Sequence, residues 1–226
     1  TVTVDGPDAR RVDVDLTTHA FALDEVVRWV PALSLYSERR GEYKAYMRTT
    51  LIGGDLSATR EVRQRTSLRI GYTFEYGSTL ADAPALCALF NLCDRDSRER
   101  IGERLPLGVA SAALVRARTD NPVSPTRGTL FRSELRSSAS GLLGTSDTLF
   151  FNKLTSDLVW YTPVGANVLM LRVRGGLVLG RTLTFADSGL FVPPQERLYA
   201  GGPTSVRGFQ QNELGSVVYI TRSRSE

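Results

Sequence analysis

Residues 66–77 read T-S-L-R-I-G-Y-T-F-E-Y-G, and apolar side chains alternate here with polar or small ones. The apolar set is Leu68, Ile70, Tyr72, Phe74 and Tyr76. A repeat of two residues is the period of a β-strand, in which successive side chains point to opposite faces. Aromatic and β-branched residues are also enriched in strands. This stretch therefore predicts a strand with one apolar and one polar face.

The same alternation recurs along the chain. It predicts strands at 29–37, 43–60, 66–77, 105–119, 128–138, 148–162, 168–180 and 214–222, and a further strand with less defined limits near 10–22. Residues 1–28 are accordingly expected to hold one or more partial strands, and 29–226 the main sheet. With about eight or nine such strands, the sequence predicts an all-β, antiparallel fold.

The two faces of these strands differ in composition. One face is continuously apolar, as at Leu169, Leu171, Val173, Leu177 and Leu179. The other carries Arg and Lys in mid-strand, as at Arg132, Arg136, Lys153, Arg172 and Arg174. A lipid-facing exterior and a polar lumen require this division, so we predict an antiparallel transmembrane β-barrel. A soluble β-sandwich also alternates and is the alternative fold.

The connections between the predicted strands differ in length. Short polar turns are expected at 61–65, 121–128 and 163–166, and longer segments at 78–104, 139–147 and 181–213. The connection at 38–42 belongs with the longer set by strand count, although it is short. Outer-membrane barrels have short periplasmic turns and long extracellular loops. We therefore predict that 78–104 and 181–213 are extracellular loops, and we call residues 181–213 the signature loop.

Composition excludes several classes of protein. The chain has 226 residues, of which 42% are hydrophobic and 23% charged, so it is not a disordered chain. Its mean hydropathy is −0.14, and no apolar run reaches the roughly 18 residues of a membrane helix. The net charge is +4, but the arginines are scattered singly, which argues against nucleic acid as a partner. No secretory signal is visible, so it was removed or the chain begins within a longer protein.

Motifs of catalysis and metal binding are absent from the sequence. His19 is the single histidine, and no G-x-S-x-G, H-E-x-x-H, Walker or G-x-G-x-x-G motif occurs. We predict no enzyme, no metal site and no cofactor. Cys87 and Cys93 form either a local disulfide or two free thiols, and both readings stay open. Residues 84–94 have apolar side chains at helical spacing and predict a short helix within the long loop 78–104.

Residues 192–215 read V-P-P-Q-E-R-L-Y-A-G-G-P-T-S-V-R-G-F-Q-Q-N-E-L-G. This stretch resembles the signature of the outer-membrane protein insertase superfamily, also called the bacterial surface antigen family, whose barrels are of the BamA and TamA kind. That signature joins E-R-x-x-x-G-G, V-R-G-F/Y and N-x-L-G. The matching residues are Glu196, Arg197, Gly201, Gly202, Val206, Arg207, Gly208, Phe209, Asn212, Leu214 and Gly215.

A second stretch, R-T-D-N-P-V-S-P-T-R-G at 118–128, resembles a periplasmic turn of the same family. Its residues are Asp120, Asn121, Pro122, Pro125, Arg127 and Gly128. The two stretches are the specific part of a resemblance that extends over about residues 29–222.

The resemblance implies a location in the bacterial outer membrane and a function in assembling other outer-membrane proteins. In this family the signature loop folds back into the lumen, and its arginine, here Arg207, contacts carboxylates on the strands that follow. The barrel inserts client β-barrel proteins by thinning the membrane and opening a seam between its first and last strands. The implied partners are outer-membrane lipid, client barrels or an exported polypeptide, and assembly proteins that bind upstream modules. No cofactor is implied.

The chain also departs from the family pattern. Family barrels have about sixteen strands, so the eight or nine predicted here are expected to be the middle of a barrel. The partners of Arg207 are then expected beyond Glu226. A two-partner secretion pore shares the V-R-G-F/Y loop and is an alternative function. A soluble β-sandwich binding module is another, and a barrel attached to a lipolytic domain is a third.

Overall fold

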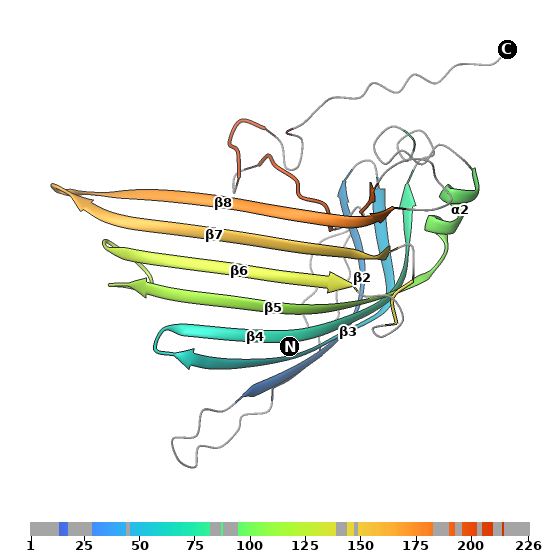
Figure 1. Ribbon diagram of the computed structural model, residues 1–226, viewed down its shortest axis with the longest axis horizontal. Coiled ribbons are helices and arrows are strands. Elements are labelled where there is room, and N and C mark those ends of the chain that lie inside the picture. Colours follow the sequence, from blue (N-terminus) through green and yellow to red (C-terminus); the bar gives the residue numbers. More distant parts are fainter. Residues whose placement is uncertain are drawn as a thin grey trace.

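A computed structural model describes residues 14–17, 29–43, 46–81, 87, 95–138, 144–146, 149–182, 190–192, 196–202, 205–209 and 214. The strands in this part of the chain form one antiparallel sheet in which each pairs with the next (Figure 1). They are β1 (Val14–Thr17), β2 (Val30–Tyr43), β3 (Tyr46–Arg63), β4 (Thr66–Ala81), β5 (Leu105–Thr119), β6 (Gly128–Ser138), β7 (Phe151–Val164), β8 (Asn167–Thr182) and β9 (Leu190–Phe191). The helix α2 (Arg95–Gly102) lies between β4 and β5. The sheet is open, with β1 and β9 at its edges.

The turns and long connections lie at opposite ends of the sheet. The β3–β4, β5–β6 and β7–β8 turns lie at the left-hand end in Figure 1, and α2 lies at the other end. The predicted division into a short-turn end and a long-loop end is therefore present in the fold. Among the described residues, no helix has the length and hydropathy needed to cross a bilayer.

Two predicted strands match the structure residue for residue, and others differ at their ends. β5 and β6 have the predicted limits 105–119 and 128–138. The predicted connection at 38–42 is wrong, because these residues belong to β2 and Glu38 pairs with Thr50. Register shifts between Tyr36 and Glu38 and between Arg40 and Tyr43 interrupt the period of two, which is why the alternation did not reveal the strand.

The signature loop, predicted as a connection, contains the end of β8 and all of β9. Its first residues, Arg181 and Thr182, end β8 and pair with β9. Of the predicted strand at 214–222, only Leu214 is described, and it forms an isolated bridge with Ala200. Of the predicted helix at 84–94, only Cys87 is described, and it is helical. The helix α2 follows it, in the charged segment, where Arg95 and Glu99 form an ion pair of 2.7 Å one turn apart.

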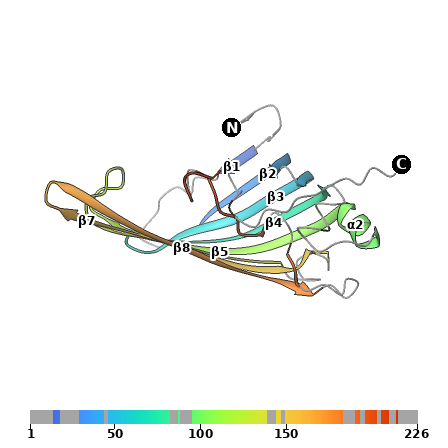
Figure 2. The same cartoon turned by 90° about the horizontal axis from the view of Figure 1, so that it is seen from above.

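Strand register sorts the side chains onto two faces. The outer face carries large apolar side chains that the sheet leaves exposed, from Ile52 (66% exposed) on β3 to Val173 (61% exposed) on β8. The inner face carries polar and charged residues, among them Asp55, Arg69, Glu134, Arg136, Asp157 and Arg172. Figure 2 shows the sheet strongly curved, with the signature loop within the curve. An exposed apolar face of this extent is typical of a surface that contacts membrane lipid.

Hydrogen bonds join several polar side chains of the inner face. Asp55 accepts from the Arg69 guanidinium at 2.8 Å and from the Thr73 hydroxyl at 2.9 Å. The Tyr36 hydroxyl donates to Glu75 at 2.9 Å. The Tyr36 ring lies over Gly53, where a Cβ would stand 2.4 Å from a ring carbon, so a larger residue at 53 would displace it. These contacts link β2, β3 and β4 across the inner face.

The small apolar core lies on the inner face toward the long-loop end. Its members are almost fully buried: Leu107, Val109, Leu149 and Phe151. Thr145 closes this core by accepting from the Gly108 amide at 2.9 Å and donating to the Gly108 carbonyl at 2.6 Å. The sheet therefore packs apolar groups inside at one end and keeps the rest of its inner face polar.

The signature loop as candidate functional site

Three glycines shape the described part of the signature loop. Gly201, Gly202 and Gly208 have φ angles of +114°, +93° and +95°, a region in which residues with a Cβ are strained. The Gly202 amide donates to the Phe209 carbonyl at 3.0 Å and closes the tip. The Leu214 amide donates to the Ala200 carbonyl at 3.0 Å and brings the chain back beside itself. The glycines of the signature are thus required by a tight, folded-back tip.

Glu196 fastens this loop to the inner face. Its side chain is 5% exposed and forms ion pairs with Arg136 on β6 at 2.9 Å and with Lys153 on β7 at 3.3 Å. Arg136 and Lys153 are paired across the two strands, so their positive charges are neighbours. One buried carboxylate therefore neutralises two adjacent cations of the lumen.

A second contact presses the loop onto β8. Leu198 lies over Gly176, where a Cβ would approach the Leu198 side chain to 2.7 Å. Arg197, the signature residue that follows Glu196, donates a hydrogen bond from Nε to the Val192 carbonyl at 3.2 Å. This bond links two parts of the loop. The glycine on β8 is thus what allows the loop to lie against the strand.

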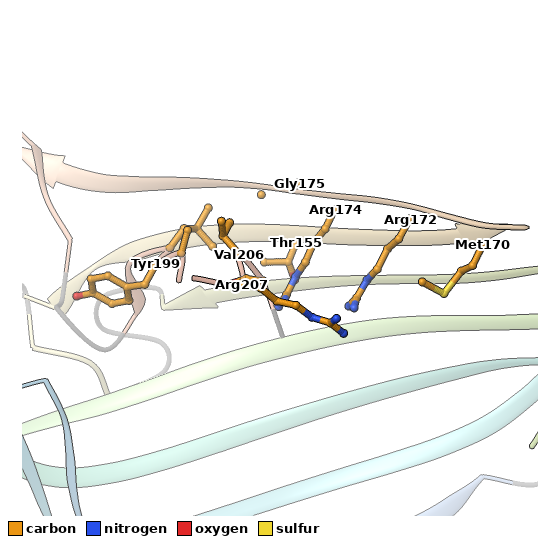
Figure 3. Close-up of a pocket in the computed structure, with 12 residues that line it drawn as sticks. Thr155, Met170, Arg172, Arg174, Gly175, Tyr199, Val206 and Arg207 are labelled. Atoms are coloured by element: carbon orange, nitrogen blue, oxygen red, sulfur yellow. The ribbon is translucent and has the colours of Figure 1, made fainter. Parts of the chain in front are cut away.

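The loop tip and β8 enclose a cavity that we call the arginine pocket. Its volume is about 620 Å³. It is lined by Arg172, Arg174 and Gly176 of β8 and by Leu198, Tyr199 and Arg207 of the loop, among others. Figure 3 shows Arg207 extending to the same side of β8 as Arg172 and Arg174. Positive charge is therefore gathered in one place.

A carboxylate beside this cluster, Asp157, is already engaged. Asp157 on β7 accepts from Arg172 Nε at 2.9 and 3.1 Å, and the two residues also form an ion pair through the Arg172 Nη2. Arg207 has no ion pair with any other residue that the structure describes. The arginine pocket is thus arranged to accept an anionic group. That the group lies beyond Glu226 stays a prediction.

The signature residues predicted from the sequence do not all lie within the described part of the chain. Glu196, Arg197, Gly201, Gly202, Val206, Arg207, Gly208, Phe209 and Leu214 are described, whereas Asn212 and Gly215 are not. The residues that the sequence did not point to are the partners on the sheet: Arg136, Lys153 and Gly176. The only signal for Arg136 and Lys153 was the recurrence of cations on one strand face, and Gly176 had none.

The turn between β5 and β6 is organised by Asp120 and Asn121. Asp120 accepts from the Thr126 hydroxyl, from the Thr126 amide at 2.9 Å and from the Arg127 amide at 3.1 Å. Asn121 accepts from the amides of Val123 and Ser124. Gly128 has a φ of +116° where a Cβ would meet the Arg118 carbonyl at 2.0 Å. Pro122, Pro125 and Arg127 lie in this turn. Its periplasmic side stays a prediction.

Asp120→Ala is expected to loosen this turn. The hydrogen bond from Thr126, followed by that from the Arg127 amide, holds the pKa of Asp120 far below its ordinary value of 3.8. Stability from a depressed carboxyl pKa is present above the unfolded pKa and is lost as the pH falls through the folded pKa. The loosening should therefore be full at neutral pH and shrink below about pH 4. Exchange of the Thr126 and Arg127 amides should rise roughly threefold at pH 7. Ser124→Ala, whose hydroxyl does not organise the turn, should leave both amides protected; equal effects of the two variants would contradict this role of Asp120.

Cys87 is disulfide-bonded, and the described part of the chain contains no free cysteine. Cys93, the other cysteine of the sequence, lies outside the described residues. The pairing of Cys87 with Cys93 therefore stays a prediction.

Comparisons with known proteins agree on one family. A family model described as the Omp85 superfamily domain matches residues 2–224. The chain is 31% identical over 118 residues to the outer membrane protein assembly factor BamA of Nitratidesulfovibrio vulgaris, an overlap of 52% of this chain and 14% of that protein. The chain thus spans a small part of the length of this relative.

A solved structure has the same fold. It is the crystal structure of BamA from Haemophilus ducreyi lacking POTRA domains 1–3, with a TM-score of 0.65 and 18% identity. The overlap covers 92% of this chain and 39% of that chain. The open, curved sheet is therefore like a segment of that larger fold.

Proposed function

This chain belongs to the Omp85 superfamily of bacterial outer-membrane proteins, and we propose that it is the middle of a barrel that inserts other outer-membrane β-barrel proteins. The observation that carries the proposal is the signature loop held against the inner face by Glu196, with Arg207 presented in the arginine pocket. The name of the similar protein, an assembly factor of the outer membrane, supports the same function. We assign the chain no enzymatic reaction and no cofactor.

The proposed mechanism uses the loop as a brace inside the lumen. A brace that is fixed by ion pairs at its base and by an arginine at its tip holds the curvature of the strands around it. In the complete barrel, that curvature would hold the edge strands in position to receive a client strand by β-augmentation. The clients would be unfolded outer-membrane barrels, and assembly proteins would bind modules upstream of this chain.

A polypeptide export pore is the second candidate. It is favoured by the polar inner face, since an extended chain would pass along hydrogen-bonding side chains. The β-sandwich module does not fit, because the described strands form one sheet whose apolar face is exposed. Nothing in the described residues represents a lipolytic domain.

The test is client insertion by the complete protein that carries this chain. Arg207→Ala should slow insertion of a client barrel into liposomes about tenfold, as the loss of a charged hydrogen bond would. Arg207→Lys should restore part of the rate, because lysine keeps the charge but lacks the planar fork. Arg95→Ala, on the exposed helix α2, is the control and should insert clients at the normal rate.

Two results would contradict the proposal. Equal insertion rates in wild type, Arg207→Ala and Arg207→Lys would reduce Arg207 to a surface charge. If Arg207→Ala inserted clients at the normal rate but translocated an extended polypeptide more slowly, the export pore would be favoured instead.

A further inference from the structure

The outer face carries little charge, and most of it lies toward the short-turn end. Over β2 to β8, the described outer-face positions contain no Asp or Glu. By register, their charged residues are Arg60, Arg63, Arg116 and Arg118 toward the short turns, and Arg39 and Arg181 toward the other end of the sheet. Arg60 pairs with Leu68, Arg116 with Phe131 and Arg118 with Thr129, which places all three on the apolar side of the sheet.

These three arginines lie close to the short-turn end. Arg60 lies near the end of β3 at Arg63, and Arg116 and Arg118 near the end of β5 at Thr119. Short turns mark the periplasmic side of outer-membrane barrels. The arginines are therefore at the level where the periplasmic leaflet has its headgroups.

Tryptophans lie beside these arginines. The guanidinium carbon of Arg60 is 5.9 Å from the centre of the Trp29 ring. Trp160 pairs with Thr129, the same residue that pairs with Arg118. Their exposed fractions are 38% and 51%, and the chain has no other tryptophan. Tryptophan is enriched where hydrocarbon meets headgroups. The arginines and the tryptophans therefore indicate, independently of each other, that this end of the outer face lies at the headgroup level.

The arginines of this belt have no acidic partner. None of the three forms an ion pair with a residue that the structure describes. The Nε of Arg60 is buried and makes no hydrogen bond. An arginine at the membrane surface extends its guanidinium toward the headgroups and binds phosphate through two parallel hydrogen bonds.

We propose that Arg60, Arg116 and Arg118, flanked by Trp29 and Trp160, form a belt that binds anionic phospholipid headgroups of the periplasmic leaflet. Phosphatidylglycerol is the headgroup class that fits, because it keeps a net negative charge that a zwitterionic lipid lacks. The belt fixes the barrel in depth and enriches anionic lipid around it. This inference needs the outer-membrane location of the chain but not its insertion activity.

The experiment reads the lipid beside the two tryptophans. The complete protein, with any tryptophans outside this chain changed to Phe, is folded into vesicles of phosphatidylcholine and phosphatidylglycerol. Either lipid is brominated near the headgroup end of its acyl chains, and quenching of Trp29 and Trp160 is measured. Brominated phosphatidylglycerol should associate roughly fivefold more strongly than brominated phosphatidylcholine at low salt. The preference should fall as salt rises.

Matched variants separate this belt from general electrostatics. The triple change Arg60→Gln, Arg116→Gln and Arg118→Gln should abolish the preference, and the corresponding triple change to Lys should keep most of it. Arg132→Gln, which removes an arginine from the inner face, should keep all of it. Gel mobility of unheated samples verifies that each variant is folded.

Three outcomes would overturn the proposal. The first is equal quenching by both lipids in the wild type, and the second is a preference that survives the triple change to Gln. The third is stronger competition by lipid A than by unlabelled phosphatidylglycerol, which would place the belt against the lipopolysaccharide leaflet.

Discussion

Glu196→Gln is expected to release the signature loop from the inner face while the strands of the sheet stay paired. The substitution removes the charge that neutralises Arg136 and Lys153 and leaves two adjacent cations unpaired on the inner face. Loss of one partner of a buried ion pair costs about 3–5 kcal/mol, and Glu196 is buried enough for this range to apply. Arg136 is partly exposed, so we expect the lower end, about 3 kcal/mol.

The measurement is protease cleavage within the signature loop of the complete, folded protein. When opening is fast compared with cleavage, the cleavage rate follows the population of the open loop, and about 3 kcal/mol corresponds to a rise of roughly a hundredfold. Glu134→Gln is the matched control, since Glu134 lies on the same face of β6 and forms no ion pair with the described residues of the loop.

A charge-balanced variant distinguishes electrostatics from packing. Adding Arg136→Met and Lys153→Met to Glu196→Gln removes all three charges and should restore most of the protection, because apolar replacements of a buried ionic cluster are often neutral. Cleavage at the same rate in Glu196→Gln and Glu134→Gln would show that the carboxylate does not hold the loop.

The strands were predictable because each carries its own signal. β5 and β6 alternate throughout, end in residues typical of turns and are found at the predicted residues. The extension of β2 through Glu38 was not predictable, because register shifts interrupt the alternation. Nor was the inner position of Leu107 and Val109, since an apolar residue on a strand does not say which face receives it.

The glycines and the motif of the signature loop were visible in the sequence, but the attachment of the loop was not. Glu196 is 43 residues from Lys153, and nothing local to either marks the pair. Only the strand register, which places Arg136 beside Lys153, creates a place for one carboxylate between two cations. Long-range ion pairs of this kind depend on the pairing of the whole sheet, so short segments of sequence do not predict them.

The second large effect is expected on the outer face of β8. Val173→Arg places a charge on an outer-face residue in the middle of the strand, far from both ends. A charge at the midplane of a lipid-facing strand costs about 2–4 kcal/mol, and the cost falls to about 0–1 near the interfaces. Leu171→Arg should therefore cost less, because Leu171 pairs with Trp160 of the belt.

The neighbouring residue on the inner face provides the contrast. Arg172→Leu removes the hydrogen bonds to Asp157, but Arg132 and Arg174 lie directly opposite the same carboxylate on both sides. Because Arg172 is 41% exposed, we expect a loss of only about 1 kcal/mol. The free energy of unfolding is measured by urea titration of the complete protein in vesicles. Val173→Arg should lower it most, and Arg172→Leu and Leu171→Arg should lower it less. A larger loss for Arg172→Leu than for Val173→Arg would show that the lipid-facing and lumen-facing sides of β8 are assigned the wrong way round. A larger loss for Leu171→Arg than for Val173→Arg would move the midplane toward the short turns, and the arginine belt would then lie within the hydrocarbon rather than at the headgroups.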